Sequence, residues 1–231
     1  EVFNRSLIEE NLMAKEDDEK IFNNIEFVVG IDRFGEVDLV IEAIIEVLNI
    51  KQDYWKGVEA VANKDAIFAT NTSGLRINEI SAKLDDKTRF IGTHFFNPGH
   101  LVPLVELIRG DETSDEVMNT MTELMESINK VPVVVQKDAP GFFANRLQFA
   151  VIREAMHILE EGIGEAKDID NAMKYGPGFR YPIIGPLETS DFGGLDVFED
   201  IMSYLFLDLA DNKEVNDVIV NLNKEGKHGI K

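Results

Sequence analysis

The sequence predicts an α/β fold, with a mostly parallel sheet domain over residues 1–138 and an all-helical domain over residues 139–231. Three observations predict this division. Short apolar runs alternate with stretches of helical periodicity up to about residue 135, and no strand pattern occurs beyond the sequence DAPG at 138–141. Apolar residues then recur every three or four positions, as they do on one face of a helix.

Six apolar runs have the length and composition of strands: 25–29, 38–45, 66–70, 89–96, 101–108 and 131–135. Segments with helical spacing lie at 6–24, 50–61, 117–128, 142–159, 168–175, 186–206 and 214–224. Thr113 and Glu116 have the spacing of a capping box that would open the helix around 117–128. The sequence GPGFRYPIIGP at 176–186 predicts a loop because it is rich in glycine and proline.

Composition excludes several classes of protein. The chain has 231 residues, is 44% hydrophobic and carries a formal charge of −20, so it is long enough for a packed core and disfavours nucleic acid and acidic membrane surfaces as partners. It contains no cysteine, which excludes disulfides and thiolate metal sites and agrees with a cytoplasmic location. We find no apolar run long enough for a membrane span and no signal-peptide pattern at the start.

The most informative polar residues are His94 and Glu106, which interrupt two neighbouring apolar runs. An unpaired carboxylate at Glu106 would cost several kcal/mol if buried, so it needs a partner. Alternation along residues 89–96 places His94 among bulky apolar neighbours, where it could be a satisfied core histidine or the partner of Glu106. A carboxylate that holds one imidazole nitrogen leaves the other free to act as a base.

Two further polar residues stand at positions suited to a site. Ser73 follows the predicted strand at 66–70, at the edge where open α/β sheets bind ligands, although most serines in turns are only turn formers. Asn145 occupies the apolar stripe of the helix at 142–159, so its amide either bonds the backbone between the domains or points into a cleft between them. The four histidines lack the spacing of a metal site, and no G-x-S-x-G hydrolase motif occurs.

Six sequence blocks, in this order along the chain, resemble the L-3-hydroxyacyl-CoA dehydrogenase family: VDLVIEAIIEVLNIK, IFATNTSGL, RFIGTHFFNPGHLVPLVELIRG, KDAPGFFANRL, DIDNAMKYGPG and GPLETSDFGGLD. The resemblance implies a Rossmann-like domain and NAD-dependent oxidation of the 3-hydroxyl of an (S)-3-hydroxyacyl-CoA, or the reverse. It also implies an acyl-CoA partner, a homodimer formed through the helical domain, and a role in fatty acid β-oxidation or butanoate metabolism.

The resemblance also implies roles for individual residues. His94 would be the general base, oriented by Glu106, and Ser73 and Asn145 would contact the substrate. The positions that resemble the family's NAD-contacting residues are Glu46, Lys51, Ser73 and Asn97. Ser6 weakly matches a residue that touches CoA.

The chain departs from the family pattern in four places. It lacks the family's first βαβ unit, of roughly 30 residues, which carries the G-x-G-x-x-G turn, so we expect a chain cut from a longer protein that by itself binds NAD weakly. The family also continues beyond the final sequence GKHGIK. Gly74 and Pro103 replace a small polar residue and a lysine, respectively, that are more usual in the family.

Two other hypotheses stay open. The chain could be a non-catalytic protein that reuses the scaffold, as crystallins of this resemblance do, although intact His94, Glu106, Ser73 and Asn145 argue against it. A β-hydroxyacid dehydrogenase of the 6-phosphogluconate type would share the two-domain plan but use a catalytic lysine. Acyl-chain length and fusion to other enzymes are not encoded in recognisable residues.

Overall fold

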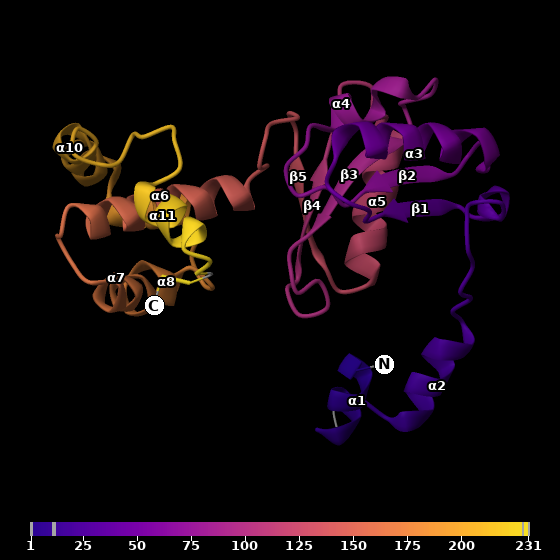
Figure 1. Ribbon diagram of the computed structural model, residues 1–231, viewed down its shortest axis with the longest axis horizontal. Coiled ribbons are helices and arrows are strands. Elements are labelled where there is room, and N and C mark those ends of the chain that lie inside the picture. The colour runs from indigo at the N-terminus through magenta and orange to yellow at the C-terminus, as the bar shows by residue number, and fades with distance from the viewer. Residues whose placement is uncertain (1, 11–12, 228, 231) are drawn as a thin grey trace.

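A computed structural model describes residues 2–10, 13–227 and 229–230, with only the backbone described for residues 2, 3 and 6. The first half forms a five-stranded sheet of order β1-β2-β3-β4-β5 (Figure 1). The strands are β1 (Leu39–Glu42), β2 (Ile67–Thr70), β3 (Phe90–Phe95), β4 (Leu104–Ile108) and β5 (Val131–Val135). Neighbouring strands are parallel except β3 and β4, which are antiparallel. The predicted mostly parallel α/β sheet is therefore confirmed.

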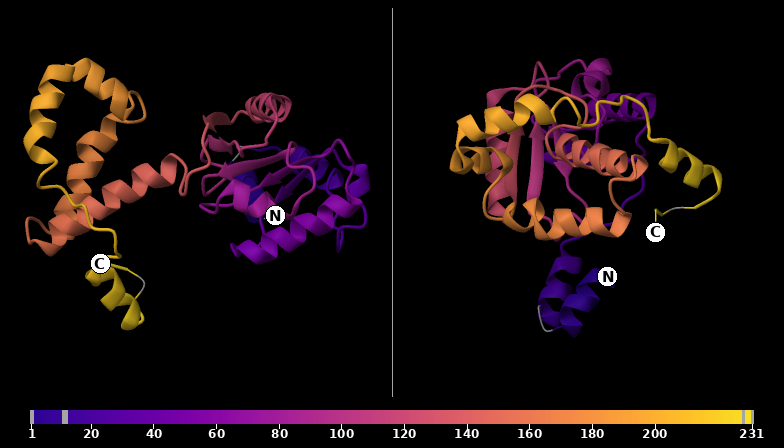
Figure 2. Two further views of the ribbon diagram at one scale, coloured as in Figure 1. Left: turned by 90° about the horizontal axis from the view of Figure 1, so that it is seen from above. Right: turned by 90° about the vertical axis from the view of Figure 1, so that its left-hand side faces the viewer.

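The helices of this half are α1 (Val2–Glu9), α2 (Lys15–Asn23), α3 (Leu48–Val61), α4 (Ile77–Ile80) and α5 (Asp115–Ser127), with short 3₁₀ turns at Phe34–Glu36 and Ser81–Lys83. Helices α3 and α5 cover opposite faces of the sheet (Figure 2). Successive strand residues point to opposite faces, so Phe90 packs in the core with Trp55 of α3, while Ile91 packs in the core with Met121 of α5.

Two predictions near the N-terminus are wrong. The predicted helix at 6–24 is instead two helices, α1 and α2, because residues 13 and 14 are not helical. The run at 25–29 is not a strand, and its Phe27 and Val29 are 83% and 102% exposed. A strand needs a neighbour to satisfy its backbone groups, and the described residues form no strand beside this run.

The start of α5 differs from the predicted capping box. Ser114, not Thr113, is the N-cap, and its hydroxyl accepts a hydrogen bond from the N–H of Val117 at 3.2 Å. The Thr113 hydroxyl instead donates to the carbonyl of Phe90 at 2.7 Å and accepts from the N–H of Gly110 at 2.9 Å. Thr113 therefore joins the loop before α5 to the start of β3.

The second half is helical, as predicted. Its elements are α6 (Ala144–Glu160), α7 (Ala166–Tyr175), α8 (Pro177–Arg180), α9 (Pro186–Gly193), α10 (Leu195–Leu205) and α11 (Asp217–Lys224). Helix α8 lies inside the predicted loop, and Gly194, with a φ of 90°, divides the predicted helix at 186–206 in two. Helix α6 leads away from the sheet, and α7 packs against it (Figure 1). None of the helices among the described residues has the length and apolar character needed to cross a membrane.

Among the glycines of the sheet domain, Gly92 has the least room for a side chain. A Cβ there would lie 2.6 Å from Cδ1 of Ile77 and 2.9 Å from Cβ of Ile108, closer than atoms can pack. We expect Gly92→Ala to lower the free energy of unfolding by about 1–3 kcal/mol, because β3, β4 and α4 must move apart. Urea unfolding followed by the fluorescence of the buried Trp55 measures it.

Gly57→Ala is the matched control. Gly57 lies inside α3, and a Cβ there would make only an ordinary contact of 3.6 Å with Ile31. This variant should be more stable than wild type by about 0.5–1 kcal/mol, because alanine has the higher helix propensity. Equal stability of the two variants would contradict the close packing at Gly92.

Candidate active site

Most of the predicted site residues lie at one edge of the sheet. The parallel strands β1, β2 and β3 end there, and Glu46, Ser73 and Asn97 follow these three strands in turn. Strand β4 runs the other way, so it begins at the same edge. In open α/β sheets this edge is where ligands bind.

His94 and Glu106 are direct neighbours across β3 and β4. They are register partners, and Nδ1 of His94 lies 2.8 Å from Oε2 of Glu106. His94 is 5% exposed and Glu106 is 0% exposed, and the rings of Phe96 and Phe142 lie 5.6 and 5.7 Å from the imidazole. A carboxylate accepts a proton-bearing Nδ1, so the neutral imidazole keeps its lone pair on Nε2. The predicted pairing of His94 with Glu106 is confirmed.

The second oxygen of Glu106 holds the start of α6. Oε1 accepts hydrogen bonds from the N–H groups of Phe143 at 2.8 Å and Ala144 at 2.9 Å. Burial raises the pKa of Glu106, but the hydrogen bonds from His94, Ala144 and Phe143 together outweigh it, so the pKa lies below its ordinary value. Glu106 is therefore ionised at neutral pH while fully buried.

A left-handed turn delivers these two N–H groups. Gly141 has a φ of 75° and Phe142 a φ of 49°, although Phe142 carries a large side chain and is 1% exposed. Such a conformation is unfavourable for a bulky residue, so it persists only where the surroundings enforce it. Here the buried Phe142 ring and the two hydrogen bonds to Glu106 fix the turn.

Asn145, in the first turn of α6, connects the helical half to the sheet. Its Nδ2 donates a hydrogen bond of 2.8 Å to the backbone carbonyl of Ser73. The sequence left two roles open for this amide, a bond to the backbone between the two halves or a position in a cleft. The contact with Ser73 is the first of these, a bond to the backbone. Asn145 is partly exposed, and its stripe neighbours Phe149 and Ile152 are 61% and 37% exposed, so this part of the stripe is not buried within the chain.

Ser73 is also held from the other side, by Glu46. Oε1 of Glu46 accepts hydrogen bonds from the N–H of Ser73 at 2.9 Å and from the hydroxyl of Thr72, and Oε2 lies 3.2 Å from the ammonium of Lys51. Burial raises the pKa of Glu46, but the contacts with Thr72, Lys51 and Ser73 lower it below the ordinary value. Ser73 thus lies between Glu46 and Asn145.

Lys51 is 0% exposed, although the sequence placed it in a cofactor pocket. Its ammonium lies 2.6 Å from Oε1 of Glu42, so Lys51 joins Glu42 to Glu46. Sequence reasoning missed Glu42, which the structure places fully inside this network. The signal was available, because Glu42 is a carboxylate at the end of the apolar run LVIE, much as Glu106 is a carboxylate inside the apolar run LVELI.

Two predicted residues lie outside this network. Asn97 is exposed, two residues beyond β3, and precedes a cis peptide bond to Pro98. The hydrogen bonds that join Ser73, Glu46 and Asn145 do not include it. The backbone of Ser6 lies in α1, and its side chain is outside the described part of the structure.

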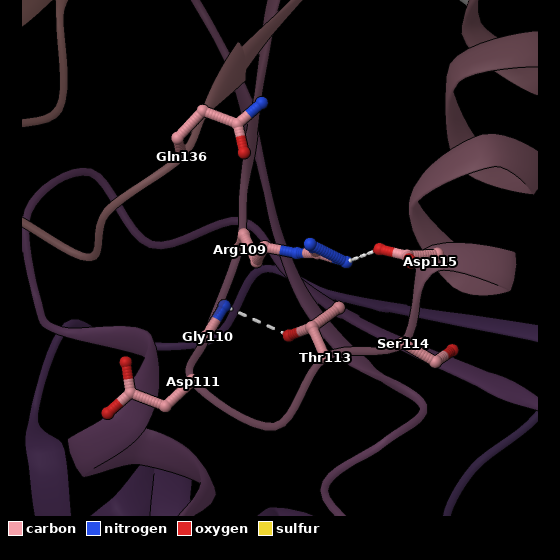
Figure 3. Close-up of a pocket in the computed structure, with 7 residues that line it drawn as sticks. All are labelled: Arg109, Gly110, Asp111, Thr113, Ser114, Asp115 and Gln136. Carbon is pink, nitrogen blue, oxygen red and sulfur yellow. Dashed lines mark hydrogen bonds and ion pairs between the residues drawn. The ribbon is translucent and has the colours of Figure 1, made fainter.

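A separate hollow of about 460 Å³ lies at the opposite edge of the sheet, beyond the end of β4 (Figure 3). It is lined by Arg109, Gly110, Asp111, Thr113, Ser114, Asp115 and Gln136. Arg109 pairs with Asp115, and Gly110 donates to Thr113, so these groups hold the loop together (Figure 3). No group of three or more His, Cys, Asp or Glu side chains within the described ranges is arranged to hold a metal ion.

Comparison with known proteins shows the family of the chain. The family model for the 3-hydroxyacyl-CoA dehydrogenase NAD binding domain matches residues 3–139, and the model for the C-terminal domain of the same enzymes matches residues 141–231. A 3-hydroxybutyryl-CoA dehydrogenase of Clostridioides difficile is 40% identical over 194 residues, covering 84% of this chain and 68% of the relative.

Two other relatives widen the comparison. A 5-formyl-3-hydroxy-2-methylpyridine 4-carboxylate 5-dehydrogenase of Mesorhizobium japonicum is 35% identical over 87% of this chain, and the match spans 65% of that relative's length. The solved structure of an (S)-3-hydroxybutyryl-CoA dehydrogenase from Ralstonia eutropha superposes with a TM-score of 0.79 at 33% identity, covering 97% of this chain and 78% of that one. The chain therefore belongs to the 3-hydroxyacyl-CoA dehydrogenase family.

Proposed function

We propose that this protein oxidises the 3-hydroxyl of an (S)-3-hydroxyacyl-CoA with NAD, or catalyses the reverse reduction. The observation that carries the proposal is the buried His94–Glu106 pair, 2.8 Å apart, in a chain of this family. A family relationship alone does not fix an activity, but a base held in one tautomer at the ligand-binding edge supplies the required proton transfer.

In this proposal the chain handles the proton and positions the substrate. Nε2 of His94 takes the hydroxyl proton while the hydride leaves C3, and the C–O bond becomes a carbonyl. Glu106 keeps the proton of Nδ1 in place and stabilises the imidazolium that forms. NAD, when bound, supplies the acceptor of the hydride.

The residues at the sheet edge fit the nicotinamide end of NAD. Glu46 is partly exposed and ionised, and a carboxylate accepts hydrogen bonds from ribose hydroxyls. We assign Glu46, Ser73 and Asn97 to the cofactor pocket, with the buried Lys51 behind Glu46 as its support, and Ser73 and Asn145 to the substrate. The division into a cofactor-binding part (1–138) and a substrate-binding, dimerising part (139–231) belongs to the same proposal.

An acyl-CoA partner, a cytoplasmic location and a place in fatty acid β-oxidation or butanoate metabolism also belong to the proposal. The relatives named 3-hydroxybutyryl-CoA dehydrogenase support it. A second candidate is NAD-dependent oxidation of an aldehyde on a carboxylated pyridine, which the name of the Mesorhizobium japonicum relative suggests. Parallel assays measure NADH formation with 3-hydroxybutyryl-CoA and with the formylpyridine carboxylate. The substrate with the higher kcat/KM identifies the correct candidate.

His94→Gln tests the proton transfer. We expect kcat for 3-hydroxybutyryl-CoA to fall by about 10²-fold or more, because glutamine cannot take up the proton. His157→Gln is the control, since His157 lies in the last turn of α6, far along the chain from the sheet edge, and it should change kcat less than about threefold. A His94→Gln enzyme with the wild-type rate, or a wild-type protein inactive on this substrate, would refute the proposal.

Glu106→Gln tests the link between the base and α6. All the partners of Glu106 are donors, so the glutamine NH₂ faces either His94 or the N–H groups of Phe143 and Ala144. We expect a lower kcat and a free energy of unfolding reduced by about 1.5–3 kcal/mol at pH 7, as for one lost hydrogen bond to a charged group.

The stability difference should depend on pH in one direction. The folded-state pKa of Glu106 lies below the ordinary value of 4.5, so its stabilisation is fully present above pH 4.5 and is lost as the pH falls through the folded-state value. Urea unfolding of wild type and Glu106→Gln between pH 7 and pH 3 measures it, with the exposed Glu123→Gln as control. A gap between the two proteins that widens on acidification would contradict this account.

The exposed apolar surface of the helical half supports a homodimer. Leu187, Phe192 and Leu207 are 81%, 81% and 87% exposed, and large exposed apolar patches usually mark protein interfaces. We expect light scattering to give twice the mass of one chain, and Leu187→Asp to shift the protein toward the monomer because it places a charge in the interface. Lys64→Asp, on the sheet domain, is the control. A monomeric wild-type protein at micromolar concentration would overturn the dimer.

A further inference from the structure

Glu42, at the end of β1, is a buried carboxylate that accepts four hydrogen bonds. It is 1% exposed. Oε1 accepts from the ammonium of Lys51 at 2.6 Å and from the N–H of Ile44 at 2.7 Å. Oε2 accepts from the hydroxyl of Thr70 at 2.8 Å and from the indole N–H of Trp55 at 3.3 Å. These donors come from α3, from β2 and from the chain leaving β1, so Glu42 joins three elements at the edge that carries the site.

Only a carboxylate suits this position. All four partners of Glu42 are donors, and an ionised carboxylate accepts at both oxygens. A glutamine would turn its NH₂ group toward two of these partners, and because only the Thr70 hydroxyl can turn to accept, at least one donor would be left unsatisfied in the interior. The environment therefore selects a charge, and not merely a polar side chain.

The charge of Glu42 is what permits Lys51 to be buried. The Lys51 side chain is 1% exposed, and a buried ammonium needs a close counter-charge. Glu46 also lies near it, at 3.2 Å, but the Glu46 side chain is 42% exposed. Glu42 is thus the buried partner that fixes Lys51, and Lys51 in turn fixes one oxygen of Glu46.

The other oxygen of Glu46 holds the turn after β2. It accepts from the N–H of Ser73 at 2.9 Å and from the hydroxyl of Thr72, and the carbonyl of Ser73 then accepts from Asn145. An unbroken series of contacts therefore runs from Glu42 through Lys51 and Glu46 to Ser73. None of these steps involves His94 or Glu106.

We propose that Glu42 is a positioning residue for the reaction, which holds Lys51 and Glu46 and thereby sets the Ser73 turn that faces the cofactor. The statement that the Ser73 turn faces the cofactor rests on the proposed function, whereas the contacts from Glu42 to Ser73 do not. Glu42 touches neither substrate nor cofactor in this account. Its loss should weaken cofactor binding more than it slows the chemical step.

The main test is Glu42→Gln in the protein that carries this chain. We expect KM for NAD to rise by about tenfold or more, while kcat at saturating NAD changes less than about threefold, because ground-state binding is what is lost. The ¹H–¹⁵N resonance of the Ser73 amide should shift in the same variant, because its acceptor, Glu46, has moved. This second readout needs no activity, so it separates failure of this inference from failure of the proposed function.

Glu59→Gln is the matched control. Glu59 lies on α3 and, like Glu42, accepts hydrogen bonds from a lysine, Lys56, and from backbone N–H groups, those of Asp85 and Asp86. It holds a different turn, so its variant should leave KM for NAD and the Ser73 resonance unchanged. A folded Glu42→Gln protein with wild-type KM and an unmoved Ser73 resonance would overturn the proposal.

If Glu42→Gln does not fold, variants of Thr70 test the same proposal. Thr70→Val removes one of the four donors and leaves the Glu42 charge in place. It should raise KM for NAD and shift Ser73 in the same direction but to a smaller extent, and Thr70→Ser, which keeps the hydroxyl, should restore both. Equal behaviour of the valine and serine variants would refute the role of Glu42.

Discussion

The carboxylate of Glu106 connects His94, the base in the proposed reaction, to the boundary between the two halves of the chain. One oxygen fixes Nδ1 of His94, and the other accepts the N–H groups of Phe143 and Ala144 at the start of α6. Because Glu106 is fully buried, it is tolerated only while both sets of donors are in place. The orientation of the His94 ring and the position of the helical half therefore depend on the same side chain. The left-handed backbone at Phe142, which aims the two N–H groups, is part of this constraint.

The same physical solution occurs twice at the carboxyl edge of the sheet. Glu42 and Glu106 both lie within apolar strands, and both are buried. In each of them both oxygens accept hydrogen bonds, and the donors come from more than one element. Glu106 organises the side on which we place the proton transfer, and Glu42 organises the side on which we place the cofactor. Ser73 lies between them, held by Glu46 from one side and by Asn145 from the other. A buried carboxylate costs free energy, but it fixes several elements in one arrangement that an apolar residue would leave free to slide.

Much of the sheet domain was predictable from local patterns, and the failures have identifiable causes. The runs at 66–70 and 131–135 are strands because each has a neighbour to pair with, whereas the run at 25–29 is also mostly apolar but pairs with no strand among the described residues. The pairing of His94 with Glu106 followed from the cost of a lone charge in an apolar strand. The same argument applied to Glu42 predicts that this carboxylate needs partners. It does not identify them, because the donors Lys51, Trp55 and Thr70 come from separate segments and show no joint pattern.

By itself, the sequence determined the α/β class, the helical second half and the pairing of His94 with Glu106, because periodicity and the cost of buried charge are local properties. Only the tertiary structure decided what the polar residues touch. It placed Lys51 inside the protein between two carboxylates, gave the Asn145 amide to the Ser73 backbone, and used the second oxygen of Glu106 to hold α6. Such contacts join residues as much as 72 positions apart in the chain, so they depend on strand order and register, which no single segment encodes.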